Sequence, residues 1–132
     1  MICLDSSFII DILKKNPEAI NTFLRIKSDF PVTTLINIYE LASGIYRIKD
    51  KNHEQHIKVL ETFLEEVRIL TLNNNSTFEA ARISAELSNQ GQIIEDLDIL
   101  VAGICLSNGC TKIVTKNIKH FSRIEGLKVE TY

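Results

Sequence analysis

The chain has 132 residues, of which 45% are hydrophobic and 24% charged, and its net charge is -2. This length favours a single domain over residues 1–132, with a core that needs no metal or disulfide to hold it together. The near-neutral charge excludes an overall basic field of the kind that attracts nucleic acid, and no apolar run approaches the ~18 residues that a transmembrane helix needs.

Short apolar segments alternate with helical patterns through the first half of the chain. In the helical segments, apolar side chains recur every three to four residues. Asn16 is a suitable N-cap, and Pro17 then stands at the first helical position, where proline is favoured. The predicted elements are a strand at 2–4, helices at 6–15 and 16–27, a strand at 30–32, helices at 33–49 and 52–66, and a strand at 67–70.

The same alternation continues to the end of the chain. A polar loop, "TLNNNST", precedes a helix at 75–92, and Gly91 stands where that helix should stop. An apolar helix that begins at residue 96 is closed by Asn108 and Gly109, and a strand at 112–114, a turn or short helix at 117–124 and a strand at 127–130 follow. Regular alternation of this kind predicts an α/β fold with a parallel sheet and helices on both faces.

The three cysteines indicate a reducing environment. Cys3, Cys105 and Cys110 are odd in number and lack C-x-x-C spacing. Cys3 and Cys105 have apolar neighbours and are expected to be small buried residues, which favours a cytoplasmic location. The amino-terminal segment has no basic residues and contains Asp5, so it lacks the pattern of a signal peptide.

Basic residues gather near the C-terminal end. Between residues 112 and 128 five Lys or Arg stand against one acid, a local balance of +4 that leaves -6 for the rest of the chain. The segment is either an anion-binding patch or a solvated face of mixed charge, and composition leaves both interpretations open. The basic residues are Lys112, Lys116, Lys119, Arg123 and Lys128.

Polar residues follow the first and fourth predicted strands. Functional residues of open parallel sheets collect at the carboxyl ends of strands. Asp5 follows the strand at 2–4, and Thr115 and Asn117 follow the strand at 112–114. Asp96 and Asp98 begin the apolar helix. The acids also have structural interpretations, since Asp5 and Asp96 are suitable N-caps and Asp98 would meet the positive end of its helix.

Glu40 lies within the helix predicted at 33–49. On a helical projection it falls on the less apolar arc, so periodicity alone predicts a surface position. Its small neighbours Ser43 and Gly44 would leave open space around the carboxylate. The apolar stripe of this helix contains Leu35, Ile38, Tyr39, Leu41, Ala42, Ile45 and Ile48, and the opposite arc contains Asn37, Ser43, Gly44 and Arg47.

Four segments together resemble the PIN-domain nucleases, and within them the VapC-type toxins of toxin–antitoxin pairs. The segments are "LDSSFIIDIL", "INIYELASGI", "DLDILVAGICLSNG" and "IVTKNIKHFSRIEGLKVE", which cover nearly the whole chain in order. The last segment is the most specific, with its strand, T-x-N, basic turn, H-F-x-R-I and G-L. The resemblance implies a three-layer α/β/α sandwich with a central parallel sheet, and a cluster of acids that binds Mg²⁺ or Mn²⁺.

The resemblance also implies roles for individual residues. Asp5, Glu40 and Asp98 match the three acids that are catalytic and bind metal. Asn117 occupies the position of a fourth acid, and Asp96 is a second candidate beside Asp98, ranked as a capping or outer residue. The implied supporting residues are Ser6, Thr115 and Asn117, and the substrate-binding residues expected from the basic turn are Lys116, Lys119 and Arg123.

The function implied by the resemblance is magnesium-dependent endoribonuclease activity, with metal-activated water hydrolysing RNA phosphodiesters. Hard oxygen ligands suit Mg²⁺, and three close carboxylates should raise at least one pKa in the metal-free protein. The implied partners are RNA, a cognate antitoxin that lies in an apolar groove, and a second copy in a homodimer, with no membrane. The alternative is a non-catalytic or RNA-processing PIN-like binding domain.

Other sites and classes fit the sequence less well. His53 and His56 are three residues apart, whereas the H-E-x-x-H zinc motif needs four. A receiver-like phosphoacceptor domain needs paired acids after the first strand, and a haloacid-dehalogenase-like phosphatase needs D-x-D, but "DSS" provides neither. His120 is expected to pack or form a hydrogen bond beside Phe121 rather than act as a base.

Overall fold

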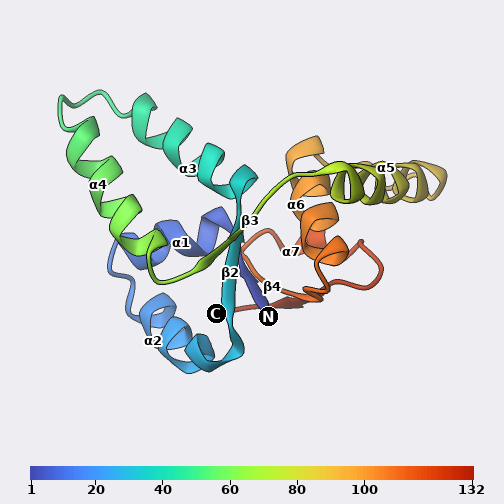
Figure 1. Cartoon of the computed structure of the whole chain (residues 1–132), viewed down its shortest axis with the longest axis horizontal. Coiled ribbons are helices and arrows are strands. Elements are labelled where there is room, and N and C mark those ends of the chain that lie inside the picture. Colours follow the sequence, from blue (N-terminus) through green and yellow to red (C-terminus); the bar gives the residue numbers. More distant parts are fainter.

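The computed structural model describes residues 1–132 and contains a five-stranded sheet at its centre (Figure 1). The strands are β1 (Ile2–Leu4), β2 (Pro31–Thr34), β3 (Arg68–Leu70), β4 (Lys112–Val114) and β5 (Lys128–Glu130). Their order across the sheet is β3-β2-β1-β4-β5, and every neighbouring pair is parallel. The parallel sheet predicted from the alternation of elements is therefore confirmed.

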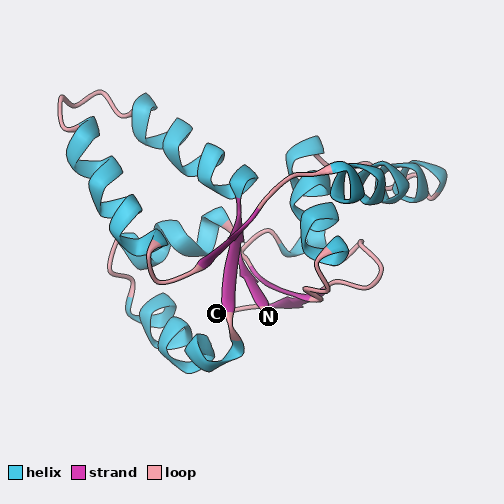
Figure 2. Cartoon of the chain, viewed as in Figure 1, coloured by secondary structure: helices cyan, strands magenta, loops and turns pink.

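Helices form a layer on each face of the sheet, as the cyan ribbons on either side of the strands show in Figure 2. One layer contains α1 (Ser6–Leu13), α2 (Pro17–Ile26), α3 (Leu35–Arg47) and α4 (His53–Leu64), with a short 3-10 helix η1 (Lys27–Asp29) after α2. The other layer contains α5 (Asn74–Asn89), α6 (Asp96–Ser107) and α7 (Ile118–Phe121). The architecture is the predicted three-layer α/β/α sandwich.

The buried strands supply side chains to both layers. In β1, Ile2 and Leu4 pack with the cluster that contains Phe8, whereas Cys3 packs with the cluster under α5 and α6. This division follows from the strand geometry, because successive side chains point to opposite faces of a sheet. All three β1 side chains are fully buried, so this strand is a rigid base for the residue that follows it, Asp5.

The helix ends agree with the predictions in part. Asn16 caps α2, since its side chain accepts hydrogen bonds from the backbone N–H of Glu18 and of Ala19. The predicted cap of α6 is wrong, because Glu95 occupies the N-cap position and Asp96 is already the first helical residue. Neither acid makes a side-chain capping hydrogen bond.

The predicted start of α3 is also wrong. Thr33 and Thr34 belong to β2, where Thr33 is paired with Ile69 of β3. Thr34 then caps α3 through a reciprocal pair of hydrogen bonds with Asn37. The two threonines suit a strand because both are β-branched. The helical periodicity that begins at Leu35 led the predicted helix to be extended back over them.

The orientation of α3 differs from the periodicity prediction. Tyr39 belongs to the apolar stripe but is 60% exposed, whereas Asn37 on the opposite arc is fully buried. The polar arc turns inward because it meets the start of α1 just beyond the carboxyl end of β1, where Asn37 and Glu40 contact Ser6. Hydrophobic periodicity cannot anticipate a helix that buries its polar arc against a polar site.

The cysteines are all buried and unpaired, Cys110 as well as the two expected to be buried, Cys3 and Cys105. None of the helices is both long and apolar enough to cross a membrane.

Candidate active site

The centre of the site lies where β1 and β4 end side by side. Leu4 of β1 pairs with Val114 of β4, so the next residues, Asp5 and Thr115, leave the sheet as neighbours. Thr115 Oγ1 donates a hydrogen bond of 2.6 Å to Asp5 Oδ2. Both residues are buried, Asp5 with 5% and Thr115 with 1% of its surface exposed. The sheet thus fixes the position of the first acid.

Asp5 stands at the N-cap position of α1, but its side chain does not cap the helix. Its Oδ1 accepts a hydrogen bond of 3.0 Å from Asn37 Nδ2. Its Oδ2 accepts from Ser7 Oγ at 3.0 Å in addition to Thr115. The capping interpretation of Asp5 is therefore wrong for the side chain, which is instead held by three donors, one from α1, one from α3 and one directly after β4.

Glu40 reaches the same region from α3. Its Oε1 accepts a hydrogen bond of 2.9 Å from Ser6 Oγ, and Asn37 Nδ2 lies 3.1 Å from that hydroxyl. Burial raises the pKa of the Glu40 carboxyl, and the negative charges of Asp5 and Asp98 raise it further, although the Ser6 hydrogen bond opposes the shift. Glu40 is half-buried at the site, so the surface position predicted from periodicity is wrong.

Asp98 projects from the first turn of α6 and is 7% exposed. Its Oδ2 accepts hydrogen bonds from Asn117 Nδ2 at 2.8 Å and from His120 Nδ1 at 2.6 Å. Burial raises the pKa of the Asp98 carboxyl, the His120 hydrogen bond opposes this, and the charge of Asp5 adds to it. Asp96, by contrast, is exposed and makes no side-chain hydrogen bond.

A continuous chain of hydrogen bonds joins the three acids. Asn117 completes it, because its backbone N–H donates to Thr115 Oγ1 at 2.9 Å and its amide donates to Asp98. The structure therefore brings together Asp5, Glu40, Asp98, Ser6, Thr115 and Asn117 of the predicted site, and leaves Asp96 outside. In order, the chain runs Glu40, Ser6, Asn37, Asp5, Thr115, Asn117, Asp98 and His120.

Four further residues lie near the site that the sequence patterns did not assign to it. Asn37 could have been found, because it precedes Glu40 by one helical turn. Ser7 gave no signal beyond its place after Asp5. His120 was expected to form a hydrogen bond in its turn, and the structure identifies Asp98 as a partner. Glu95 adds negative charge that raises the pKa of both Glu40 and Asp98.

The donor chemistry of the site fits a hydrated divalent cation. Aspartate and glutamate oxygens are the hard ligands that Mg²⁺ prefers, and the raised pKa values of Glu40 and Asp98 mark carboxyls that a nearby cation would stabilise in their charged form. No group of three or more Asp, Glu, His or Cys side chains is arranged to hold one ion directly. Mg²⁺ usually keeps several waters and uses one or two carboxylates, so these acids suit an ion held partly through water.

The basic residues of the C-terminal turn are in different environments. Lys116 forms an ion pair with Asp11 and lies 5.8 Å from the centre of the Tyr132 ring. Arg123 lines a small cleft together with Glu125. Lys119 is exposed and has no ion-pair partner. Of the three predicted RNA contacts, Lys116 is thus the one that forms an ion pair, whereas Lys119 and Arg123 are both exposed and form none.

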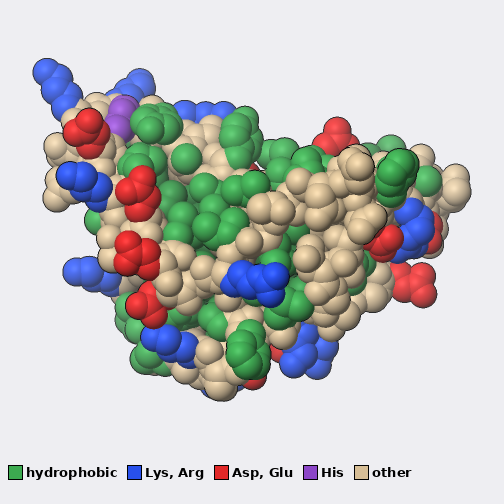
Figure 3. Space-filling model, viewed as in Figure 1, with side chains coloured by type: hydrophobic (Ala, Val, Ile, Leu, Met, Phe, Trp, Pro, Cys, Tyr) green, Lys and Arg blue, Asp and Glu red, His purple; other side chains and the backbone are tan.

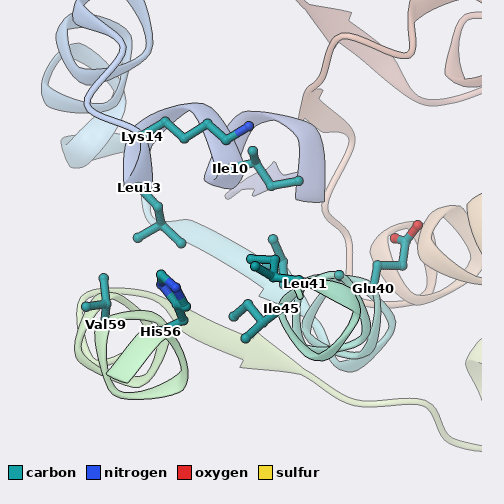
Figure 4. A pocket seen from close by; sticks show the side chains of 10 residues that line it. Ile10, Leu13, Lys14, Glu40, Leu41, Ile45, His56 and Val59 are labelled. Carbon is teal, nitrogen blue, oxygen red and sulfur yellow. The ribbon is translucent and has the colours of Figure 1, made fainter. Parts of the chain in front are cut away.

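An apolar groove opens beside the acids, between α1, α3 and α4. It has a volume of about 460 Å³, and Figure 3 shows hydrophobic side chains gathered over this part of the surface. In Figure 4, Leu13, Ile45 and His56 point into the space between the helices, with Val59 at one side and Glu40 at the other. The lining residues are Ile10, Leu13, Lys14, Glu40, Leu41, Gly44, Ile45, Ile48, His56 and Val59.

The histidines of α4 contact the turn that precedes this helix. His56 Nε2 lies 3.2 Å from Asp50 Oδ2, and His53 Nε2 lies 2.6 Å from the carbonyl oxygen of Ile48. Both rings therefore contact residues of the turn between α3 and α4.

Comparison with known proteins matches the PIN domain family to residues 2–127. Ribonuclease VapC2 of Rickettsia felis is 30% identical over 131 residues, covering 98% of this chain and 96% of the relative. The tRNA(fMet)-specific endonuclease VapC of Salmonella typhimurium is 27% identical over 129 residues, with the same coverage of 98% and 96%.

Solved structures of VapBC complexes contain chains with the same fold. A crystal structure of VapBC2 from Rickettsia felis, bound to a DNA fragment from its promoter, contains a chain that is 28% identical with a TM-score of 0.88, covering 100% of this chain and 99% of that one. The DNA-bound VapBC of Salmonella typhimurium gives 26% identity and a TM-score of 0.85, covering 98% and 96%.

Proposed function

The chain belongs to the PIN-domain family, and we propose that it is a VapC-type endoribonuclease whose catalytic acids are Asp5, Glu40 and Asp98. It is a hydrolase of RNA phosphodiester bonds and the toxin of a toxin–antitoxin pair. Its activity depends on a divalent metal ion, as is general in PIN-domain ribonucleases, and Mg²⁺, or Mn²⁺ in its place, is the ion that we propose.

The observation that carries this assignment is the hydrogen-bonded chain between Glu40 and Asp98 through Asp5. Acids from α3, from the end of β1 and from α6 share one polar network at the carboxyl ends of the central strands. Burial and mutual repulsion raise the pKa of two of them. Such an arrangement costs stability unless something stabilises the charges, and perturbed carboxyls in a shared site are typical of function.

The roles of the protein groups follow from their free oxygens. Glu40 Oε2 and Asp98 Oδ1 accept no hydrogen bond, whereas the other oxygen of each carboxylate is held by donors. We therefore assign these two oxygens, together with Asp5, to the metal and its waters, with Asn117 as a neutral neighbour that orients Asp98. A bound divalent ion supplies an activated water and neutralises charge that develops on the phosphate.

The substitution of Asp98 tests the site directly. We expect Asp98→Asn to lower Mg²⁺-dependent RNA cleavage by at least ~100-fold, because a direct metal ligand is lost. Asp96→Asn is the matched control, since it makes the same change two positions earlier on an exposed side chain. Equal activity of Asp98→Asn and the wild type would refute the assignment, and RNA binding without cleavage by the wild type would indicate the non-catalytic alternative.

The basic turn is proposed to hold the RNA backbone. Lys119 and Arg123 are exposed and form no ion pair, and Lys119 is adjacent to His120 at the site, whereas Lys116 already pairs with Asp11. Removing one phosphate contact lowers the salt slope of nucleic-acid binding by about 1. We expect this change for Lys119→Gln and for Arg123→Gln and a smaller one for Lys116→Gln, whose charge is already paired with Asp11, measured in EDTA so that no cleavage occurs. An unaltered slope for Lys119→Gln would show that Lys119 is merely solvated.

The antitoxin partner is proposed to occupy the apolar groove between α1, α3 and α4. An amphipathic helix or extended segment fits a groove of this kind. Glu40 lines both the groove and the acid cluster, so a chain seated there would lie next to the catalytic acids and block RNA.

A further inference from the structure

His120 makes a close contact with a catalytic acid. Its Nδ1 lies 2.6 Å from Asp98 Oδ2, and the Asp98 side chain is only 9% exposed. Asn117 Nδ2 lies 2.8 Å from the same oxygen and 2.9 Å from the imidazole nitrogen. Two nitrogens therefore converge on one carboxylate oxygen and leave the other, Oδ1, unoccupied.

The geometry fixes which ring nitrogen carries a proton. Two lone pairs would repel at 2.6 Å, so a hydrogen lies between Nδ1 and Oδ2, and the ionised carboxylate can only accept. His120 thus donates from Nδ1, and Nε2, on the far side of the ring, makes no hydrogen bond to the protein. The carboxylate–imidazole pair is oriented in the manner of groups that hold a metal ligand in place.

The short helix α7 keeps the ring in this position. Phe121, the next residue, is fully buried in the core, and its N–H donates to the carbonyl oxygen of Asn117. The backbone at His120 is therefore anchored by its buried neighbour, which keeps the start of the imidazole side chain beside Asp98.

We propose that His120 is a positioning residue for the nuclease reaction, which holds Asp98 through Nδ1 so that Oδ1 alone faces the metal. This inference rests on the proposed function, and it assigns His120 a structural task on Asp98 rather than contact with RNA or with the ion. Groups that orient metal ligands typically change metal affinity by 10–100-fold when removed.

Metal binding of the full chain tests the proposal without reference to activity. Titration calorimetry with Mn²⁺ should show His120→Ala binding at least ~10-fold more weakly than the wild type. Mg²⁺ should give the same order of variants. Equal or tighter binding by His120→Ala would overturn the proposal, because it would mean that the imidazole does not help, or opposes, the placement of Asp98.

Two amide substitutions distinguish the ring nitrogens. The amide nitrogen of Asn can replace Nδ1, whereas that of Gln reaches toward the position of Nε2. We expect His120→Asn to restore most of the Mn²⁺ affinity and of kcat, and His120→Gln to behave like His120→Ala. Rescue by Gln and not by Asn would overturn the proposal in favour of a role for Nε2.

Two further measurements distinguish a failure of this inference from a failure of the proposed function and from misfolding of a variant. RNA affinity in EDTA should be the same for the wild type and all three His120 variants, and a loss there would overturn the proposal by indicating direct RNA contact. Thermal unfolding in EDTA identifies any variant that fails to fold. If His120→Ala does not fold, the Mn²⁺ affinity of His120→Asn is compared with that of His120→Gln instead. If the wild type binds neither Mn²⁺ nor Mg²⁺, the proposed function fails as well, whereas metal binding unaffected by His120 removes this inference alone.

Discussion

Thr115 Oγ1 donates to Asp5 Oδ2 at 2.6 Å, across 110 positions of sequence. The contact exists because β1 and β4 are neighbours in the sheet although they lie at opposite ends of the chain. Thr115 also accepts from the backbone N–H of Asn117 at 2.9 Å. One hydroxyl group thus links the acid after β1 to the loop that carries Asn117.

Replacing this hydroxyl should impair the site without opening the core. Thr115→Val keeps the branched shape but leaves Asp5 Oδ2 with one donor fewer and the Asn117 N–H without its acceptor, so we expect RNA cleavage to fall about 10–100-fold. Thr115→Ser retains the hydroxyl and is the control, and it should keep most of the activity. Cleavage rates at saturating Mg²⁺ measure both. Full activity of Thr115→Val would mean that Asp5 is oriented adequately by Ser7 and Asn37.

The sequence predicted the sheet and its surrounding helices well, for reasons that are physical. Buried parallel strands are short and continuously apolar, and strong caps such as Asn16 mark helix starts, so both are readable locally. Asp5 and Thr115 could be placed at one edge because parallel strands end together. The resemblance to PIN-domain nucleases supplied what the pattern could not, namely that Glu40 and Asp98 belong with them.

The orientation of α3 and the N-cap of α6 were predicted wrongly for related reasons. Glu40 and Asn37 lie on the polar arc of α3, and periodicity assigns a polar arc to solvent. The site reverses that rule, because its hydroxyls and amides satisfy polar side chains inside the protein. The N-cap of α6 was placed one residue late, at Asp96 instead of Glu95, since neither acid makes a side-chain capping bond that a sequence motif could signal.

The raised pKa of Glu40 predicts a pH-dependent stability of the metal-free protein. Burial is the main cause of the shift, so the folded state binds a proton at Glu40 more readily than the unfolded state does. The contribution of Glu40 to stability is fully present below its ordinary pKa of about 4.3. It is lost as pH rises through the higher pKa of the folded state.

Glu40→Gln should therefore raise the Tm of the protein in EDTA at pH 7.5 by a few degrees, because Gln can still accept from Ser6 but carries no charge. The gain should vanish near pH 4. Glu61→Gln on the exposed side of α4 is the control and should follow the wild type at both pH values. Thermal unfolding monitored by circular dichroism measures the difference. A gain that persists at low pH would show that charge at Glu40 is not the cause.

Close packing of α5 on α6 predicts a large effect at Gly103. A Cβ there would lie 2.7 Å from Ala80 Cβ and 2.8 Å from the carbonyl oxygen of Ser76. Gly103→Ala should therefore separate the helices and reduce the free energy of unfolding by about 1–3 kcal/mol. Since α6 carries Asp98, cleavage should fall too.

Gly44 is the matched control for this substitution. It also lies within a helix, but a Cβ there would meet nothing within 4 Å. Gly44→Ala should leave the protein equally stable or more stable, by up to about 1 kcal/mol, because alanine favours the helix. Urea unfolding of both variants provides the comparison. Equal stability of the two would mean that the α5–α6 contact adjusts more freely than its distances indicate.

A substitution in the groove between α1, α3 and α4 should weaken antitoxin binding without changing RNA cleavage. Val59 lines it and is 50% exposed, so Val59→Asp places a charge in the groove at little cost to folding. We expect ~10-fold or greater loss of affinity for the co-expressed antitoxin and no change in RNA cleavage by the free protein. Leu24→Asp is the control, because Leu24 is 62% exposed on α2 and does not line the groove. If Leu24→Asp weakens the complex and Val59→Asp does not, the antitoxin binds elsewhere, and inhibition must act on the acids from another side.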